Sequence, residues 1–119
     1  AMEFTDTLKK NYEFRRLYKK GKSAVTPYLV LYVRQTGRDT NRIGVTVSNK
    51  IGKAVVRNKI RRRLREIYRL REDKLCRGTD LVIVARGKSA QATYAQLERA
   101  FEKACKQLGI LSTESGQEK

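Results

Sequence analysis

The chain of 119 residues contains no histidine or tryptophan, and it has only two cysteines and one proline. Without histidine, imidazole catalysis and every metal site that uses an imidazole ligand are excluded. Two cysteines with no C-x-x-C pair are too few for a disulfide framework or a cysteine zinc site. We therefore expect Cys76 and Cys105 to be free, partly buried thiols in a reducing, cytoplasmic setting.

Long apolar runs are also missing, because no stretch approaches the roughly 20 residues needed to cross a bilayer. Residues 1–10 carry charges of both signs and no apolar segment, so we expect no signal peptide. Hydrophobic residues make up 39% of the chain, enough for one modest core at this length. We expect one RNA-binding domain over residues 1–111 and a polar, disordered tail over residues 112–119.

Acidic residues are scarce where basic residues are dense. The net charge is +16, and the window from Phe14 to Arg65 holds 16 Lys and Arg against the single acid Asp39. Such a patch repels itself unless a polyanion relieves it, and nucleic acid is the first candidate. An anionic membrane is disfavoured as a partner, because the basic residues are spread over several predicted elements instead of one amphipathic helix.

Hydrophobic periodicity predicts an α+β domain with helices packed on a mixed sheet. The predicted helices cover residues 11–20, 54–73 and 93–108, and the predicted strands cover residues 22–25, 28–35, 42–48 and 80–86. We expect Asn11 to cap the first helix and Gly21 to end it. Strands 28–35 and 42–48 are expected to form a hairpin, and strand 80–86, apolar on both faces, a central strand. Base rates favour a right-handed crossover through the second helix.

Alternation of side chains sorts the two predicted hairpin strands into two faces. The core face should carry Leu29, Leu31, Val33, Ile43, Val45 and Val47. The opposite, mixed face should carry Tyr28, Val30, Tyr32, Arg34, Gly44, Thr46 and Ser48, and it is available to solvent or a ligand.

The segment Lys50–Arg71 is the strongest candidate site, with ten basic residues against the single acid Glu66. Its apolar stripe would be buried, while the arginines gather on another arc of the helix. Arginine pairs bidentately with phosphates and base edges, and Asn58 can donate to or accept from a base or a 2′-hydroxyl. A merely solvated helix face would alternate Glu with Lys, and this segment does not.

A second candidate site combines rings with cations. Phe14 and Tyr18 fall on the first helix, and Tyr32, with Tyr28 as a further candidate, falls on the mixed sheet face. Rings beside Arg and Lys side chains suit single-stranded nucleic acid, because bases stack while cations follow the backbone. The alternative, which the residues alone leave open, is that Phe14 and Leu17 are ordinary core residues.

Catalytic groups are poorly represented. The basic window lacks the clustered carboxylates of a metal-dependent nuclease, and no Walker-type glycine loop is present. We therefore expect no catalytic residue in this chain, and any reactive site should belong to a partner.

Five segments in order resemble the protein subunit of bacterial ribonuclease P. They are LKKNYEFRRLYKKGKS, YLVLYV, SNKIGKAVV, RNKIRRRLRE and DLVIVAR, and the resemblance runs from Leu8 to Leu108. It implies an αβββαβα order, a small two-layer domain with a four-stranded mixed sheet, and a left-handed βαβ crossover. It also implies a non-catalytic subunit that assists a catalytic RNA, with Mg²⁺ held mainly by that RNA, in removing the 5′ leader of precursor tRNA. No small-molecule substrate is implied.

The resemblance assigns two sets of residues, and it leaves any metal ligand in the protein unknown. Contacts to the catalytic RNA are expected from Lys50, Lys53, Arg57, Asn58, Lys59, Arg61, Arg62 and Arg65. A cleft for the single-stranded leader is expected to involve Phe14, Arg15, Tyr18, Lys19, Tyr32, Thr46 and Ser48. Arg63 stands where relatives often carry an apolar residue, so we expect it to snorkel at the edge of the core stripe. The competing hypotheses are a ribosomal-type structural RNA-binding protein and a protein that is itself a nuclease.

Overall fold

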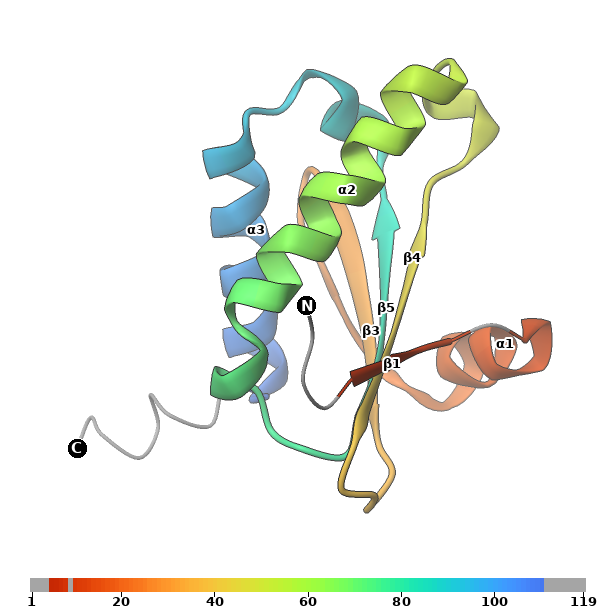
Figure 1. Cartoon of the computed structure of the whole chain (residues 1–119), viewed down its shortest axis with the longest axis vertical. Coiled ribbons are helices and arrows are strands. Elements are labelled where there is room, and N and C mark those ends of the chain that lie inside the picture. Colours follow the sequence, from red (N-terminus) through yellow and green to blue (C-terminus); the bar gives the residue numbers. More distant parts are fainter. Residues whose placement is uncertain (1–4, 9, 111–119) are drawn as a thin grey trace.

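The computed structural model describes residues 5–8 and 10–110, and the predicted tail at 112–119 lies outside them. The order αβββαβα is confirmed, with one short extra strand at its start (Figure 1). The elements are β1 (Thr5–Thr7), α1 (Asn11–Lys20), β2 (Lys22–Val25), β3 (Leu29–Gln35), β4 (Asn41–Thr46), α2 (Ala54–Leu70), β5 (Thr79–Ala85) and α3 (Tyr94–Leu108). Short 3₁₀ turns lie at η1 (Asn49–Ile51), η2 (Glu72–Lys74) and η3 (Gly87–Gln91). None of the helices in the described ranges is both long and apolar enough to span a bilayer.

The four predicted strands form one mixed sheet, and β1 joins its edge to give the order β1-β4-β5-β3-β2. β5 lies in the centre, parallel to β4 and antiparallel to β3, as its two apolar faces predict. The predicted hairpin between residues 28–35 and 42–48 is wrong, because β5 inserts between β3 and β4. Apolar sequence shows that a strand is buried, but it does not show which neighbour the strand pairs with.

The crossover from β4 through α2 to β5 is left-handed. In Figure 1, α2 lies in front of the sheet, both strands run upward, and β5 stands to the left of β4. This arrangement agrees with the family resemblance and contradicts the base-rate expectation of a right-handed connection.

The larger core lies between one sheet face and the helices α2 and α3. Leu29, Leu31 and Val33 of β3 are buried there, as alternation predicts, and α2 contributes Ile60 and Leu64 from its apolar stripe. These side chains orient α2, because burying its stripe turns the arginine arc toward solvent.

Several helix ends differ from the prediction. The N-cap of α1 is Lys10 instead of Asn11. The backbone N–H of Lys10 donates to the Glu13 carboxylate at 3.4 Å. α2 ends at Leu70 instead of residue 73, because the chain tightens into η2. Gly109 adopts a left-handed φ of 71° and closes α3.

Both cysteines are free thiols, as predicted. Cys76 is half-buried, and Cys105 is fully buried on the inner face of α3. Burial raises the pKa of Cys105 to about 12, so its thiol stays protonated at neutral pH and is a poor nucleophile.

A second, smaller core places α1 on the opposite face of the sheet. Leu8, Leu17 and Val82 are buried in it, and Phe14, Tyr32 and Val84 pack around them. The two faces of the sheet are therefore covered unequally, with α2 and α3 on one face and α1 across part of the other.

Candidate RNA interface

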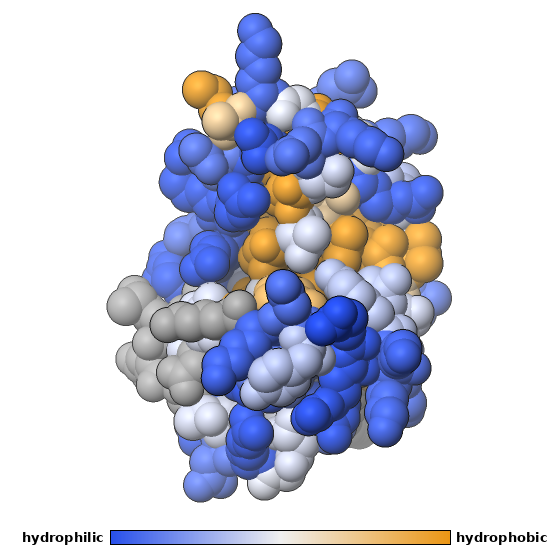
Figure 2. Space-filling model, turned by 90° about the vertical axis from the view of Figure 1, so that its right-hand side faces the viewer, coloured by the Kyte–Doolittle hydropathy of each residue, from blue (hydrophilic) through white to orange (hydrophobic). Residues whose placement is uncertain are grey.

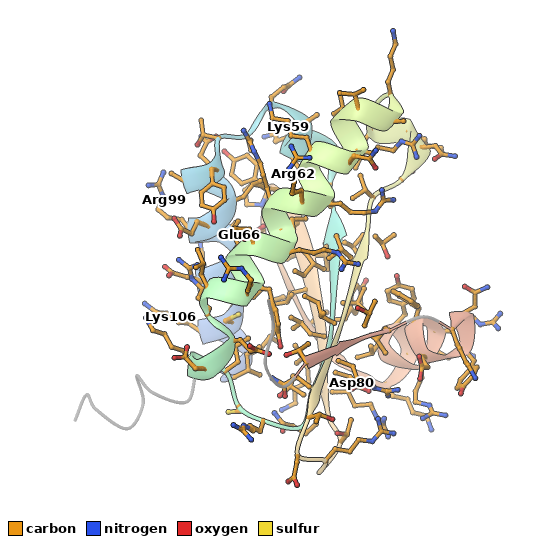
Figure 3. The ribbon with its side chains drawn as sticks, in the orientation of Figure 1. Lys59, Arg62, Glu66, Asp80, Arg99 and Lys106 are labelled. Carbon is orange, nitrogen blue, oxygen red and sulfur yellow. The ribbon has the colours of Figure 1, made fainter. Side chains whose placement is uncertain are left out.

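The outward side of the first half of α2, together with η1, carries the predicted cations. Lys50, Lys53, Lys59 and Arg62 are exposed, and Arg57, Arg61 and Arg65 are half-buried. Figure 3 shows Lys59 and Arg62 on this part of α2. Among the described residues, none of these seven cations forms an ion pair with a carboxylate. We call these seven residues, with the exposed Asn58, the α2 basic surface.

Local hydrogen bonds fix the geometry of the α2 basic surface without neutralising it. The Arg57 guanidinium donates to the Gly52 carbonyl at 3.2 Å and to Asn49 Oδ1 at 2.9 Å, tying the η1 loop to the helix. Arg61 donates to Asn58 Oδ1 at 3.2 Å. Each acceptor is neutral, so the positive charges remain available to phosphates.

Ion pairs lie at the C-terminal end of α2 and at Arg71, the residue that follows it. Arg69 pairs with Glu66 at 2.6 Å, which lowers the pKa of Glu66, and Arg71 bridges Glu98 at 2.6 Å and Glu102 at 2.9 Å on α3. Arg69 is one of the ten basic residues counted in the segment Lys50–Arg71, but in the structure it pairs with Glu66. The unneutralised charge is therefore concentrated between Lys50 and Arg65.

The sheet face opposite α2 carries a row of mainly apolar residues near the C-terminal end of β5. The strand register sets Val25 beside Val30, Val30 beside Val84, and Val84 beside Thr46. Residues directly opposite one another share a face, so the four form a row across the sheet. Val25 is 60% exposed and the other three are half-buried, which leaves the row open to a ligand.

Aromatic residues border that row where α1 meets the sheet. The Phe14 ring lies over Gly44, and the Tyr18 and Tyr32 rings meet edge to face with centroids 4.9 Å apart. Figure 2, which views the molecule from the side of β4 and α1, shows a hydrophobic band between two hydrophilic regions. We call Tyr18, Tyr32, Val30, Val84 and Thr46 the aromatic–valine surface.

The predicted leader residues are only partly gathered there. Phe14, Tyr18, Tyr32 and Thr46 come together, and Arg15 and Lys19 are exposed on the turn of α1 next to Tyr18. Ser48 lies beyond the end of β4, where its Oγ accepts from the Lys50 N–H at 3.2 Å.

Tyr28, the further aromatic candidate, packs against the larger core instead. Val30 and Val84 were not among the predicted site residues. Alternation did place Val30 on this face, whereas the doubly apolar pattern of β5 concealed Val84.

A largely buried ion cluster holds α1 against the sheet near the N-terminal ends of β4 and β5. Arg42 on β4 donates to both carboxylate oxygens of Asp80 on β5, at 3.0 and 2.7 Å, and also pairs with Glu13 of α1. Asp80 is only 3% exposed, and Figure 3 shows it beside α1. The two carboxylates raise the pKa of Arg42, which stays charged at every accessible pH.

Gly44→Ala is expected to displace Phe14 and distort the aromatic–valine surface. A Cβ at Gly44 would stand 2.6 Å from Cε1 of the Phe14 ring, too close for a carbon–carbon contact. We expect about 1–3 kcal/mol loss in the free energy of unfolding, measured by urea denaturation. Gly87→Ala is the control, because a Cβ at Gly87 meets no atom within 4 Å. Equal stability of the two variants would show that Phe14 does not rest on Gly44.

Comparison with known proteins gives consistent results. The Ribonuclease P family matches residues 2–109. The ribonuclease P protein component of Clostridium botulinum is 47% identical over 104 residues, covering 87% of this chain and 94% of that protein. The component of Alkaliphilus oremlandii is 38% identical over 112 residues, covering 94% and 98%. The Staphylococcus aureus ribonuclease P protein structure superposes with a TM-score of 0.82 at 33% identity, covering 89% of this chain and 97% of that one. The chain therefore belongs to the ribonuclease P protein family.

Proposed function

We propose that the chain uses two separate surfaces in the ribonuclease P reaction. The α2 basic surface binds the catalytic RNA subunit, and the aromatic–valine surface binds the single-stranded 5′ leader of precursor tRNA. In this proposal the RNA subunit cuts the phosphodiester bond, and the protein positions the substrate in the cytoplasm.

The observation that carries the proposal is the absence of ion pairs to carboxylates on the α2 basic surface within the described residues. Folding could have neutralised these cations with the chain's own acids, but Glu66, Glu98 and Glu102 pair with Arg69 and Arg71 instead. An uncompensated basic surface gains free energy from phosphates by releasing their counterions. When the protein lies between the RNA subunit and the precursor tRNA, this basic surface would also offset the electrostatic repulsion between the two RNAs.

The aromatic–valine surface supports a single strand as its ligand. The exposed ring of Tyr18, the half-buried ring of Tyr32 and the half-buried valines offer apolar contact to unstacked bases, while a duplex keeps its bases stacked inside. Arg15 and Lys19 on the neighbouring arc of α1 would follow the leader phosphates. This second surface distinguishes the proposal from a ribosomal-type RNA-binding protein, which needs only a basic helix.

The proposal places Mg²⁺ mainly on the RNA subunit. No cluster of three or more Asp, Glu, His or Cys residues is present in the described ranges. On the RNA subunit, the ion would act on the scissile phosphate.

Tyr18→Ala is expected to weaken binding of precursor tRNA while leaving binding of mature tRNA unchanged. Tyr18 is 40% exposed, so its removal mainly takes away a stacking partner. We expect a loss of about 1–3 kcal/mol for the precursor, or roughly 5- to 150-fold in dissociation constant. The measurement is tRNA binding by holoenzyme reconstituted with a bacterial ribonuclease P RNA, with Ca²⁺ in place of Mg²⁺ to prevent cleavage.

Tyr12→Ala is the matched control for that experiment. Tyr12 is 52% exposed on α1 and lies on a different arc from Tyr18 and Phe14. If Tyr18→Ala weakened binding of both tRNAs equally, or behaved like Tyr12→Ala, the leader would not lie on this surface.

A further inference from the structure

A hollow lies between the first half of α2, η3 and the first turn of α3. Its volume is about 360 Å³, and its apolar wall is formed by Val56, Ile60 and Ala92. It is on the α2 side of the sheet, so it is separate from the aromatic–valine surface. Neither of the two surfaces assigned above accounts for it.

The remaining walls of the hollow combine two cations with an aromatic ring. Lys59 and Arg63 line it from successive turns of α2, and the half-buried Tyr94 lines it from α3. Figure 3 shows Lys59 on the part of α2 that faces the segment leading into α3. Cations, a ring and an aliphatic wall are the features that recognise a nucleotide, with phosphate on the cations and base against the ring.

Arg63 is the residue that the α2 basic surface leaves unexplained. It is half-buried, and its guanidinium donates at 3.3 Å to the carbonyl of Ala92, which also lines the hollow. Within the described ranges it has no carboxylate partner. A single bond to a neutral carbonyl fixes the guanidinium at the wall and leaves its other N–H groups for an anion.

We propose that this hollow receives one unpaired nucleotide of the ribonuclease P RNA. A volume of about 360 Å³ lies at the small end of ligand pockets and suits one nucleotide rather than a stacked run. RNA is favoured over a free nucleotide because Lys59 belongs to both the hollow and the α2 basic surface, so a strand on α2 passes the opening. The inference rests on the proposed binding of RNA by α2.

The roles within the hollow follow from the positions of its side chains. Arg63 and Lys59 contact the phosphate of the inserted nucleotide, and its base lies between Tyr94 and the aliphatic wall. The exposed Gln91 at the rim carries an amide that can hydrogen-bond the edge of a base. The hollow therefore adds contact with one unstacked base to the charge recognition on α2.

The test measures RNA affinity for two variants. Arg63→Met keeps the aliphatic stem and removes the charge, and Tyr94→Leu keeps apolar volume and removes the ring. We expect each to raise the dissociation constant for ribonuclease P RNA about five- to tenfold. Arg99→Met, at an exposed cation on the neighbouring α3, should leave it unchanged. Tyr94→Phe should bind like the original chain, which separates a stacking role from a fold defect.

A crosslink locates the nucleotide directly. An aryl azide attached to Gln91→Cys, in a Cys76→Ser background, should crosslink to one unpaired nucleotide of the RNA. Arg63→Met should abolish that crosslink. Dispersed crosslinks, or unchanged affinity of Arg63→Met and Tyr94→Leu, would overturn the hollow as a nucleotide site. Protection of Gln91→Cys by millimolar adenosine monophosphate without RNA would instead indicate a free-nucleotide site and also overturn the proposal.

The failure of this inference is distinguishable from failure of the proposed function. If Arg62→Ala weakens RNA binding and Arg63→Met does not, the RNA binds to α2 but none of its nucleotides occupies the hollow. If neither variant weakens binding, the α2 basic surface itself is wrongly assigned.

Discussion

Replacing Lys59, Arg62 and Arg65 together by glutamine is expected to lower the affinity for ribonuclease P RNA by roughly two orders of magnitude at about 0.15 M salt. Each phosphate contact contributes about 0.9 to the slope of log K against log salt, so three lost contacts flatten it by about 2.7. Carried from 1 M to 0.15 M salt, that slope corresponds to a factor of about 170. The measurement is filter binding over a series of salt concentrations.

The structure supplies a matched control on the same helix. Arg69 is already paired with Glu66 at 2.6 Å, so Arg69→Gln should change the salt slope little. Arg57 is left out of the set because it holds the η1 loop through Gly52 and Asn49. An unchanged slope in the triple variant, or an equal change in Arg69→Gln, would mean that the RNA binds elsewhere.

Arg42→Met is expected to be the most destabilising single substitution considered, with a loss of about 3–5 kcal/mol in the free energy of unfolding. The substitution leaves the Asp80 carboxylate, 3% exposed, without its guanidinium. It also removes the ion pair between Arg42 and Glu13, so α1 loses one anchor to the sheet. Thermal or urea unfolding measures the loss, and precursor tRNA binding should weaken with it because α1 carries Tyr18.

Two further variants separate a buried charge from a general effect of removing arginine. Asp80→Asn added to Arg42→Met should recover part of the stability, because a neutral amide is cheaper to bury than an unpaired carboxylate. Arg69→Met should change stability little, because the Arg69–Glu66 pair is exposed. Comparable losses for Arg42→Met and Arg69→Met would contradict the role assigned to the buried cluster.

Local periodicity predicted most of the elements and both faces of the sheet, except that Tyr28 packs against the larger core. The alternation of side chains correctly predicted that Leu29, Leu31 and Val33 are buried. The hydrophobic period of 3.6 residues correctly predicted the buried stripe of α2 that contains Ile60 and Leu64. The pattern is informative here because each side chain's environment is decided by its own face of one element.

The sequence alone did not predict which distant segments pair with one another in the sheet. The insertion of β5 between β3 and β4 depends on how α2 returns across the sheet, and the alternation of side chains in β3 and β4 carries no information about it. β1 adds three residues to the edge, too few to show a period. The handedness of the crossover came from family resemblance, because periodicity carries no such information.

The candidate site shows the same division. The density of basic residues in the sequence predicted the α2 basic surface. Only the structure shows that Arg69 forms an ion pair with Glu66, and that Arg71 forms ion pairs with Glu98 and Glu102. Val84 joins the aromatic–valine surface through strand register, which links it to Val30 and Thr46. These relations join residues far apart in the chain, so they require coordinates.

The most direct test of two separate surfaces is the affinity of the ribonuclease P RNA for precursor tRNAs with leaders of increasing length, measured with and without this protein. The two-surface assignment predicts that affinity rises with each of the first leader nucleotides only when the protein is present, and that Tyr18→Ala suppresses the rise. An affinity that stays constant with leader length in the presence of the protein would contradict it.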